Sequence, residues 1–242
     1  MHPVSPPACV KWPARKPGES PCMRLPYSPT VWQVVPAGDQ ALLITVGTTI
    51  DPGLLGQVLA LDRALRQAWP SGLISTVPAY GSLLCRYDAE QTDATRLAQE
   101  IHAYEGTLTS SLESGPLLEI PTRYDGADLD EVAAKTNLSP AQVIELHAGR
   151  EYLVYCIGFA PGFTYCGELP AELTVPRRIT PRTKVPAGSV AIAGRQTGIY
   201  AVESPGGWNL IGHTDVRLFD VGATPPARLK PGDRIRFIPH LS

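Results

Sequence analysis

The chain of 242 residues is long enough for one large domain or two small ones, each with a buried core. Its formal net charge of −2, from 21 basic and 23 acidic residues, gives no electrostatic signature of a partner such as nucleic acid or an anionic membrane. The 25 prolines and 22 glycines predict many turns and argue against a mainly helical protein.

The N-terminal residues 1–26 are rich in proline, with lysine and arginine interspersed, and we expect them to form a disordered tail. They lack the apolar core of a signal peptide, and Met23 is an alternative start of translation. No apolar run in the chain is long enough to span a bilayer. The expected location is the cytoplasm, because the widely spaced cysteines fit reduced thiols.

Residues 27–150 are expected to form an α+β domain. The segment "QALLITVG" (40–47) predicts a buried strand, and residues 51–69 predict a helix capped by Asp51 with Pro52 at its first position. Further along the chain, the pattern predicts strands at 72–80 and 82–88, an amphipathic helix at 92–112 and a strand at 116–124. The order β-α-β-β-α-β is typical of a ferredoxin-like α/β sandwich.

Two short helices are predicted next, at 128–136 and 139–149, the second with a Ser139 cap and a terminal glycine. Beyond Glu151 the helical period disappears. Short apolar runs follow at 153–159, 189–194, 197–202, 209–214, 216–221 and 234–239. Such runs between prolines and glycines favour an all-β barrel or sandwich, so residues 151–242 are expected to form a second domain.

The glycine-rich stretch 187–208, "AGSVAIAGRQTGIYAVESPGGW", is not a standard nucleotide loop. Gly188 and Gly194 have one residue too many between them for a Walker motif, and Arg195 stands where lysine is needed. The favoured interpretation is a set of turns and bulges in a barrel. Close approach of backbone amides to a small anion stays open.

A basic segment, "VPRRITPRTKVP" (175–186), contains four cations and no acid. Its prolines favour an extended chain, which puts Arg178, Arg182 and Lys184 on one face and Arg177 on the other. Arginine side chains match carboxylate and phosphate groups, although a solvated basic edge is equally compatible with the pattern.

Histidine and cysteine give no metal motif, and the five widely spaced cysteines argue against a disulfide framework and fit reduced thiols. His147 is expected at a helix end, where the dipole stabilises a cationic ring. His213 and Asp215 form either an acid–base pair or a surface hydrogen bond. Cys156 and Cys166 stand in apolar surroundings, which favour core positions over a nucleophilic role.

Three long motifs carry a resemblance to a known family: "GFAPGFTYCGELP", "VPRRITPRTKVPAGSVAIAGRQTGIYAVESPGGWNLIGHT" and "LKPGDRIRFIP". The chain resembles the family of 5-oxoprolinase B subunits, also called KipI-like or allophanate hydrolase subunit 1, over roughly residues 30–240. This family corresponds to part of the carboxyltransferase domain of urea carboxylase. The resemblance implies an N-terminal α+β domain followed by a C-terminal cyclophilin-like β-barrel.

The same resemblance implies a reaction. Together with the A and C subunits of 5-oxoprolinase, the complex opens 5-oxo-L-proline to L-glutamate with hydrolysis of ATP, and the chain by itself is expected to be inactive. ATP with Mg²⁺ would be the cofactor of the complex, and the partners would be those subunits and a small anionic substrate. Two alternatives stay open: an inhibitor that binds a sensor histidine kinase, and a carboxyltransferase component acting on urea-derived substrates.

The motifs also suggest site residues, while the catalytic residues stay unknown and no metal ligand is expected. We expect the substrate-binding residues to be those that match the family motifs: Phe159, Pro161, Gly162, Phe163, Arg178, Arg182, Gln196, Thr197, Tyr200, Trp208 and His213. Two departures from the usual family pattern stand out. Glu168 replaces a glycine. His213 replaces an arginine, and Asp215 follows His213 two residues later in this chain.

Overall fold

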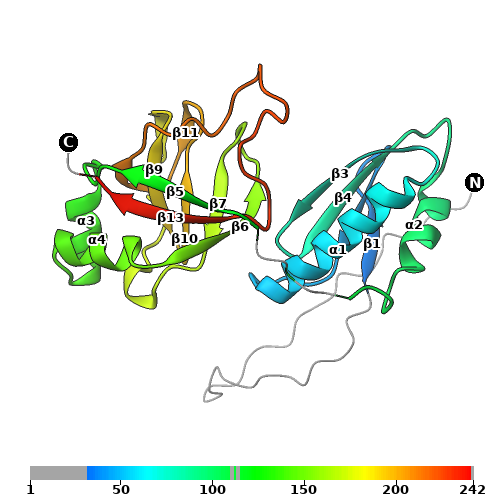
Figure 1. Ribbon diagram of the computed structural model, residues 1–242, viewed down its shortest axis with the longest axis horizontal. Coiled ribbons are helices and arrows are strands. Elements are labelled where there is room, and N and C mark those ends of the chain that lie inside the picture. The colour runs from blue at the N-terminus through cyan, green and yellow to red at the C-terminus, as the bar shows by residue number, and fades with distance from the viewer. Residues whose placement is uncertain (1–31, 110–111, 113–114, 241–242) are drawn as a thin grey trace, which may run out of the picture.

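The computed structural model describes residues 32–109, 112 and 115–240, so the predicted tail lies outside the described residues. The described chain forms two lobes that lie side by side, each built on its own β-sheet (Figure 1). No helix among the described residues is long and apolar enough to cross a membrane.

The first lobe is a four-stranded antiparallel sheet with two helices. The strands have the order β1 (Gln33–Pro36), β2 (Ala41–Thr45), β4 (Ser82–Tyr87) and β3 (Leu73–Ala79). The helices α1 (Pro52–Ala68) and α2 (Ala94–His102) pack against it. As predicted, Asp51 caps α1 by accepting a hydrogen bond from the Leu54 N–H at 3.0 Å.

The strand expected to complete a ferredoxin-like sandwich lies elsewhere. Strand β5 (Leu117–Thr122) belongs to the second sheet, where it pairs in parallel with β13 (Arg234–Pro239), and β1 takes the edge position beside β2. The ferredoxin-like prediction is therefore wrong for this strand. Its buried Ile120 packs in the same hydrophobic core as Phe237, which fixes the strand to the second lobe.

Helix α2 is shorter than the predicted span of 92–112. After His102 the chain continues in turns, in which the amides of Tyr104 and Glu105 bond to carbonyls three residues back. Gly106 then takes a left-handed conformation with φ of +73°, which an α-helix cannot accommodate.

The second lobe is a seven-stranded sheet that curls until its two edges meet. Its order is β12 (Asn209–His213), β9 (Ser189–Ala193), β10 (Gln196–Ile199), β7 (Thr164–Gly167), β6 (Glu151–Ile157), β13 and β5. Arg123, just after β5, exchanges two backbone hydrogen bonds with His213 of β12 at 2.8 and 2.7 Å. A two-stranded ribbon of β8 (Arg182–Val185) and β11 (Ser204–Gly206) accompanies the sheet, as does the short 3₁₀ helix η1 (Ala171–Leu173).

Most apolar runs predicted beyond residue 151 are strands, with one exception. Residues 216–221 form no strand and contribute only an isolated bridge between Phe219 and Ala227. Helices α3 (Leu129–Thr136) and α4 (Pro140–Ala148) pack on the second sheet, and Ser139 and Gln142 form a capping box at the start of α4. The division between the two hydrophobic cores therefore falls before residue 117 and does not coincide with the predicted boundary at residue 150.

Candidate functional site

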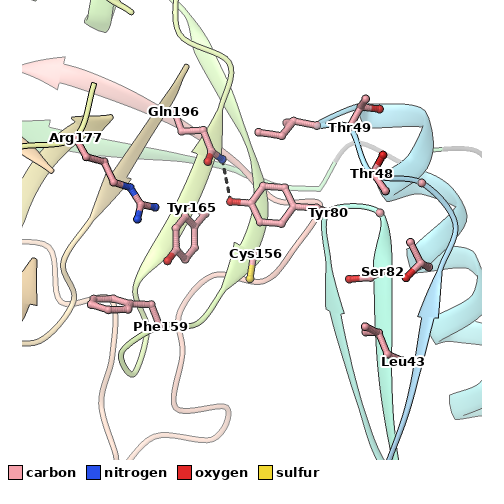
Figure 2. Close-up of a pocket in the computed structure, with 14 residues that line it drawn as sticks. Leu43, Thr48, Thr49, Tyr80, Ser82, Cys156, Phe159, Tyr165, Arg177 and Gln196 are labelled. Carbon is pink, nitrogen blue, oxygen red and sulfur yellow. Dashed lines mark hydrogen bonds between the residues drawn. The ribbon is translucent and has the colours of Figure 1, made fainter. Parts of the chain in front are cut away.

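A cleft of about 670 Å³ lies between the two lobes and receives side chains from both (Figure 2). The first lobe contributes strand β2, the loop before α1 and the β3–β4 turn. The second lobe contributes β6, β7, β10 and the basic segment. The lining residues are Leu43, Thr45, Gly47, Thr48, Thr49, Ile50, Tyr80, Gly81, Ser82, Cys156, Phe159, Tyr165, Arg177 and Gln196.

The first-lobe wall follows from the alternation of side chains along β2. Leu42 and Ile44 are buried in the core of the first lobe. Leu43 and Thr45 point to the opposite face of the sheet, and this face lines the cleft. An ordinary half-buried strand therefore supplies one polar and one apolar group to the site.

Tyr80 occupies the tip of the β3–β4 hairpin in a left-handed conformation, with φ of +51°. The neighbouring Gly81 lies so close to the loop before α1 that an added Cβ would be 2.4 Å from the Gly47 carbonyl oxygen. The amides of Val46 and Gly47 both donate hydrogen bonds to the Gly81 carbonyl. The hairpin tip is thus held firmly in the first lobe, with the Tyr80 side chain directed at the second (Figure 2).

Tyr80 contacts the second lobe through two hydrogen bonds and two ring contacts, one of them an edge contact with Tyr165 at a centroid distance of 6.2 Å. Its amide donates to the Tyr155 carbonyl at 3.1 Å, and its phenol oxygen accepts a hydrogen bond from Gln196 Nε2 at 2.9 Å. Its ring stacks on that of Tyr155, with centroids 5.7 Å apart. Tyr155 has no partner in the β6–β7 register because a bulge lies between Val154 and Cys156, which leaves its carbonyl available to the other lobe.

A second, smaller hollow of about 250 Å³ adjoins the cleft and is mainly aromatic. It shares Phe159, Tyr165 and Arg177 with the cleft, and its other lining residues are Phe163, Pro181, Tyr200, Pro205, Gly206, Gly207 and Trp208. The ring of Phe163 makes edge contacts with Tyr165, Tyr200 and Trp208 at centroid distances of 4.6 to 5.5 Å. We call this the aromatic pocket.

Arg177 lines both hollows, and its guanidinium lies 6.0 Å from the centroid of the Trp208 ring. Among the described residues it has no carboxylate within ion-pair distance. The predicted separation of Arg177 from Arg178 and Arg182 therefore holds, whereas Lys184, predicted on the same face as those two, is exposed and pairs with Glu203. The arginine that faces the cleft is Arg177, whereas Arg178 and Arg182 were expected to face the substrate.

Arg178 and Arg182 instead converge on Asp128, the residue before α3. Both guanidinium groups donate to Asp128 Oδ1 at 2.7 Å, and the Leu210 amide donates to Oδ2 at 2.7 Å. Arg178 also bonds to Glu131. The geometry does not support the prediction that these two arginines bind the substrate, because a buried internal carboxylate already occupies them.

Thr197 and His147 lie in the core of the second lobe and line neither hollow. Thr197 donates to the Ala191 carbonyl, so it accepts from His147 Nε2–H at 2.8 Å, and Nδ1 accepts from the Tyr124 hydroxyl at 2.8 Å. Burial lowers the pKa of His147 to about 3. The expectation of a cationic His147 at the helix end is therefore wrong, because the fully buried ring is neutral.

The other predicted site residues are divided between different places. Phe159, Phe163, Gln196, Tyr200 and Trp208 line the cleft or the aromatic pocket.

Gly162 forms a left-handed turn packed against Phe219, and Pro161 is exposed outside both hollows. His213 lines a separate hollow of about 290 Å³ with Arg123 and Asp215. The other departure from the family pattern, Glu168, forms a surface ion pair with Arg195 at 3.0 Å.

The electrostatic character of the cleft is positive and rich in hydroxyl groups. No carboxylate belongs to its lining within the described residues, and Arg177 supplies the formal charge. Burial raises the pKa of the Cys156 thiol to about 11, so this cysteine is protonated and a poor nucleophile at neutral pH. Burial also raises the pKa of Tyr80, which keeps its phenol as a hydrogen-bond donor.

Sequence reasoning missed the contribution of the first lobe. Tyr80 and Ser82 were expected only as parts of strands, and Thr48 and Thr49 only as part of the connection between the strand at 40–47 and the helix at 51–69. The available signal for Tyr80 was its place in a two-residue turn, directly before a glycine. Such turns favour residues that tolerate a positive φ, and tyrosine is unusual there. The hydroxyl-bearing loop gave no distinguishing pattern.

The sequence matches the family model described as "Carboxyltransferase domain, subdomain C and D" over residues 32–229. The 5-oxoprolinase B subunit from Bacillus subtilis is 36% identical over 222 residues, which cover 86% of this chain and 92% of that protein. The 5-oxoprolinase B subunit from Escherichia coli O157:H7 is 54% identical over 125 residues, or 50% of this chain and 57% of that protein. The second match therefore spans little more than half of that relative.

Among solved structures, the crystal structure of TTHA0988 matches with a TM-score of 0.75 and 41% sequence identity. The match covers 84% of this chain and 40% of TTHA0988. In TTHA0988 the matched fold is therefore one part of a longer chain.

Proposed function

Because the chain belongs to the family of carboxyltransferase domains, subdomains C and D, we propose that it is the B subunit of a 5-oxoprolinase complex. In this proposal, the complex opens the lactam of 5-oxo-L-proline to give L-glutamate, with hydrolysis of ATP, and requires the A and C subunits as partners. The observation that carries it is the similarity to the Bacillus subtilis 5-oxoprolinase B subunit along 92% of that relative's length.

The cleft between the lobes supports this proposal chemically. A small, anionic cyclic amide needs a cationic group for its carboxylate and hydrogen-bond donors for its carbonyl oxygen. Arg177 offers the cation, and Thr48, Thr49 and Ser82 are among the hydroxyl groups on the opposite wall. Among the described residues, no carboxylate lines the cleft. An anionic ligand would therefore meet no negative side chain there to repel it.

The residues of the cleft do not fit a site for Mg²⁺ and ATP. Magnesium prefers carboxylate oxygens, and none lines the cleft in the described part of the chain. The described residues also contain no group of three or more histidine, cysteine or acidic side chains that could hold a metal ion. We therefore assign the nucleotide to the assembled complex and derive no step through it in this chain.

Reconstitution tests the proposed function. The purified full-length chain, mixed with the A and C subunits, is expected to hydrolyse ATP in response to 5-oxo-L-proline and to release glutamate. The mixture of those two subunits without this chain serves as the control and should be inactive. Failure of the complete mixture to form glutamate would contradict the proposal.

The same assay separates the two alternatives considered from the sequence. A kinase inhibitor would leave the reconstituted reaction without activity and would bind the dimerisation domain of a sensor histidine kinase. A carboxyltransferase component would need a biotin carrier and would respond to urea-derived substrates in place of 5-oxo-L-proline.

A further inference from the structure

We propose that Arg177 is the carboxylate anchor of the cleft, and that the aromatic pocket beside it receives the ring of the ligand. The choice of 5-oxo-L-proline as the ligand rests on the proposed function. The preference for a small cyclic carboxylate rests on the geometry of Arg177 and its surroundings.

Internal carboxylates neutralise the other three cations of the basic segment and leave Arg177 unpaired among the described residues. Arg178 and Arg182 bond to Asp128, and Lys184 pairs with Glu203 at 2.9 Å. Arg177 has no such partner among the described residues, although it lies in the same segment. An internal carboxylate cancels much of the attraction that an arginine exerts on an external anion, so Arg177 is the cation of this segment that is available to a ligand.

Arg177 lies between two hollows of different chemistry. On one side lies the cleft, with hydroxyl groups from the first lobe, and on the other lies the aromatic pocket. Figure 2 shows the guanidinium directed into the space between Tyr165, Phe159 and Gln196. A carboxylate on Arg177 would therefore leave the rest of a small ligand against aromatic faces or hydroxyl donors.

The size and lining of the aromatic pocket favour a small ring as its occupant. A volume of about 250 Å³ suits a five- or six-membered ring better than a nucleotide. Trp208 and Tyr200 are held in place by edge contacts to the fully buried Phe163, so the pocket is formed before a ligand arrives.

A direct binding experiment tests the proposal on the full-length chain. Calorimetry would compare 5-oxo-L-proline with 2-pyrrolidinone, which is the same lactam without the carboxylate. The wild-type chain is expected to prefer the carboxylate compound, and Arg177→Gln should lose that preference by about ten- to hundred-fold. Arg177→Lys should restore part of it. Lys184→Gln removes the same charge from the same segment and should have no effect.

The reconstituted complex gives a second readout that separates this proposal from the proposed function. In an active complex, Arg177→Gln should raise the KM for 5-oxo-L-proline with little change in kcat, because the anchor binds substrate and transition state alike. An active complex whose KM is the same for Arg177→Gln and Lys184→Gln would overturn the anchor and leave the function intact. If the wild-type complex is inactive, the function fails, and calorimetry decides the anchor. If the wild-type chain binds neither compound, or binds both equally, the assignment of Arg177 as the anchor is overturned.

Discussion

Gln196 on strand β10 donates a hydrogen bond across the cleft to the phenol oxygen of Tyr80, at 2.9 Å. The two residues are 116 positions apart in the chain and belong to different lobes. Since Tyr80 also bonds through its amide to the bulged Tyr155, one hairpin tip fixes the first lobe to the second. The contacts of Tyr80 therefore contribute to the width of the cleft.

The Tyr80–Gln196 pair should be measurable as a coupling energy. Tyr80→Phe keeps the stacked ring and removes the hydroxyl, and Gln196→Leu removes the donor. A double-mutant cycle by urea unfolding is expected to give a coupling of about 1 kcal/mol, the usual net value of a hydrogen bond. Strictly additive single effects would mean that the bond contributes nothing to stability.

His147 should make the stability of the protein depend on pH. Its pKa of about 3 in the folded state lies below the unfolded value of about 6.5, so the unfolded chain binds the proton more readily. The free energy of unfolding should therefore fall as the pH drops below about 6.5, by up to about 1.4 kcal/mol per pH unit.

His147→Gln offers the comparison for this effect. Urea unfolding of both proteins between pH 7 and 4 would measure it. The variant should be less stable at pH 7, because glutamine does not reproduce the ring contacts with Phe237, but its slope with pH should be shallower. Equal slopes would show that His147 does not stay neutral on folding.

Asp128 should be important for stability rather than for ligand binding. Asp128→Asn takes the buried carboxylate away from both guanidinium groups, leaves Arg178 only its exposed partner Glu131, and is expected to cost about 3 kcal/mol. Glu131→Gln is the matched control, since it also contacts Arg178 but is exposed, and it should cost less than about 1 kcal/mol. Thermal unfolding would compare the two, and equal losses would contradict the central role of Asp128.

Gly81 should tolerate no side chain. A Cβ at this position would lie 2.4 Å from the Gly47 carbonyl oxygen, so Gly81→Ala must displace either the hairpin or the loop before α1. We expect a loss of about 1 to 3 kcal/mol in urea unfolding. Gly222→Ala is the control, because its nearest atom would be 3.5 Å away. Equal stability of both variants would mean that the contact relaxes freely.

His213, which departs from the usual family residue, should have little effect on substrate affinity. It lies with Arg123 and Asp215 in a hollow that shares no lining residue with the cleft or the aromatic pocket. In the reconstituted complex, His213→Arg is expected to change KM by no more than about twofold, as for a typical surface change. A large improvement in KM would instead give the residue a role in binding.

Local signals were readable from the sequence because their physical causes are local. Asp51 and Pro52 at the start of α1, and Ser139 at the start of α4, satisfy backbone groups only a few residues away. The alternation that separates Arg177 from Arg178 is equally local. These features were predicted correctly.

The failures concern partners distant in the chain. An apolar strand pattern at 117–122 does not specify which sheet the strand joins, and only its register with β13 settles that. Likewise, nothing near Arg178 and Arg182 indicates that Asp128, some fifty residues earlier, neutralises them. The sequence therefore proposed Arg178 and Arg182 as the cations of the site, whereas Arg177 is the arginine of this segment that lines the cleft.

Within the described residues, the backbone passes from one lobe to the other once, in the stretch between α2 and β5. Two lobes that share no β-sheet can change their relative angle without breaking either sheet. Such a motion would open and close the cleft, and the contacts of Tyr80 with the second lobe would oppose it. A partner protein bound to both lobes would then set the width of the cleft without contacting the residues that line it.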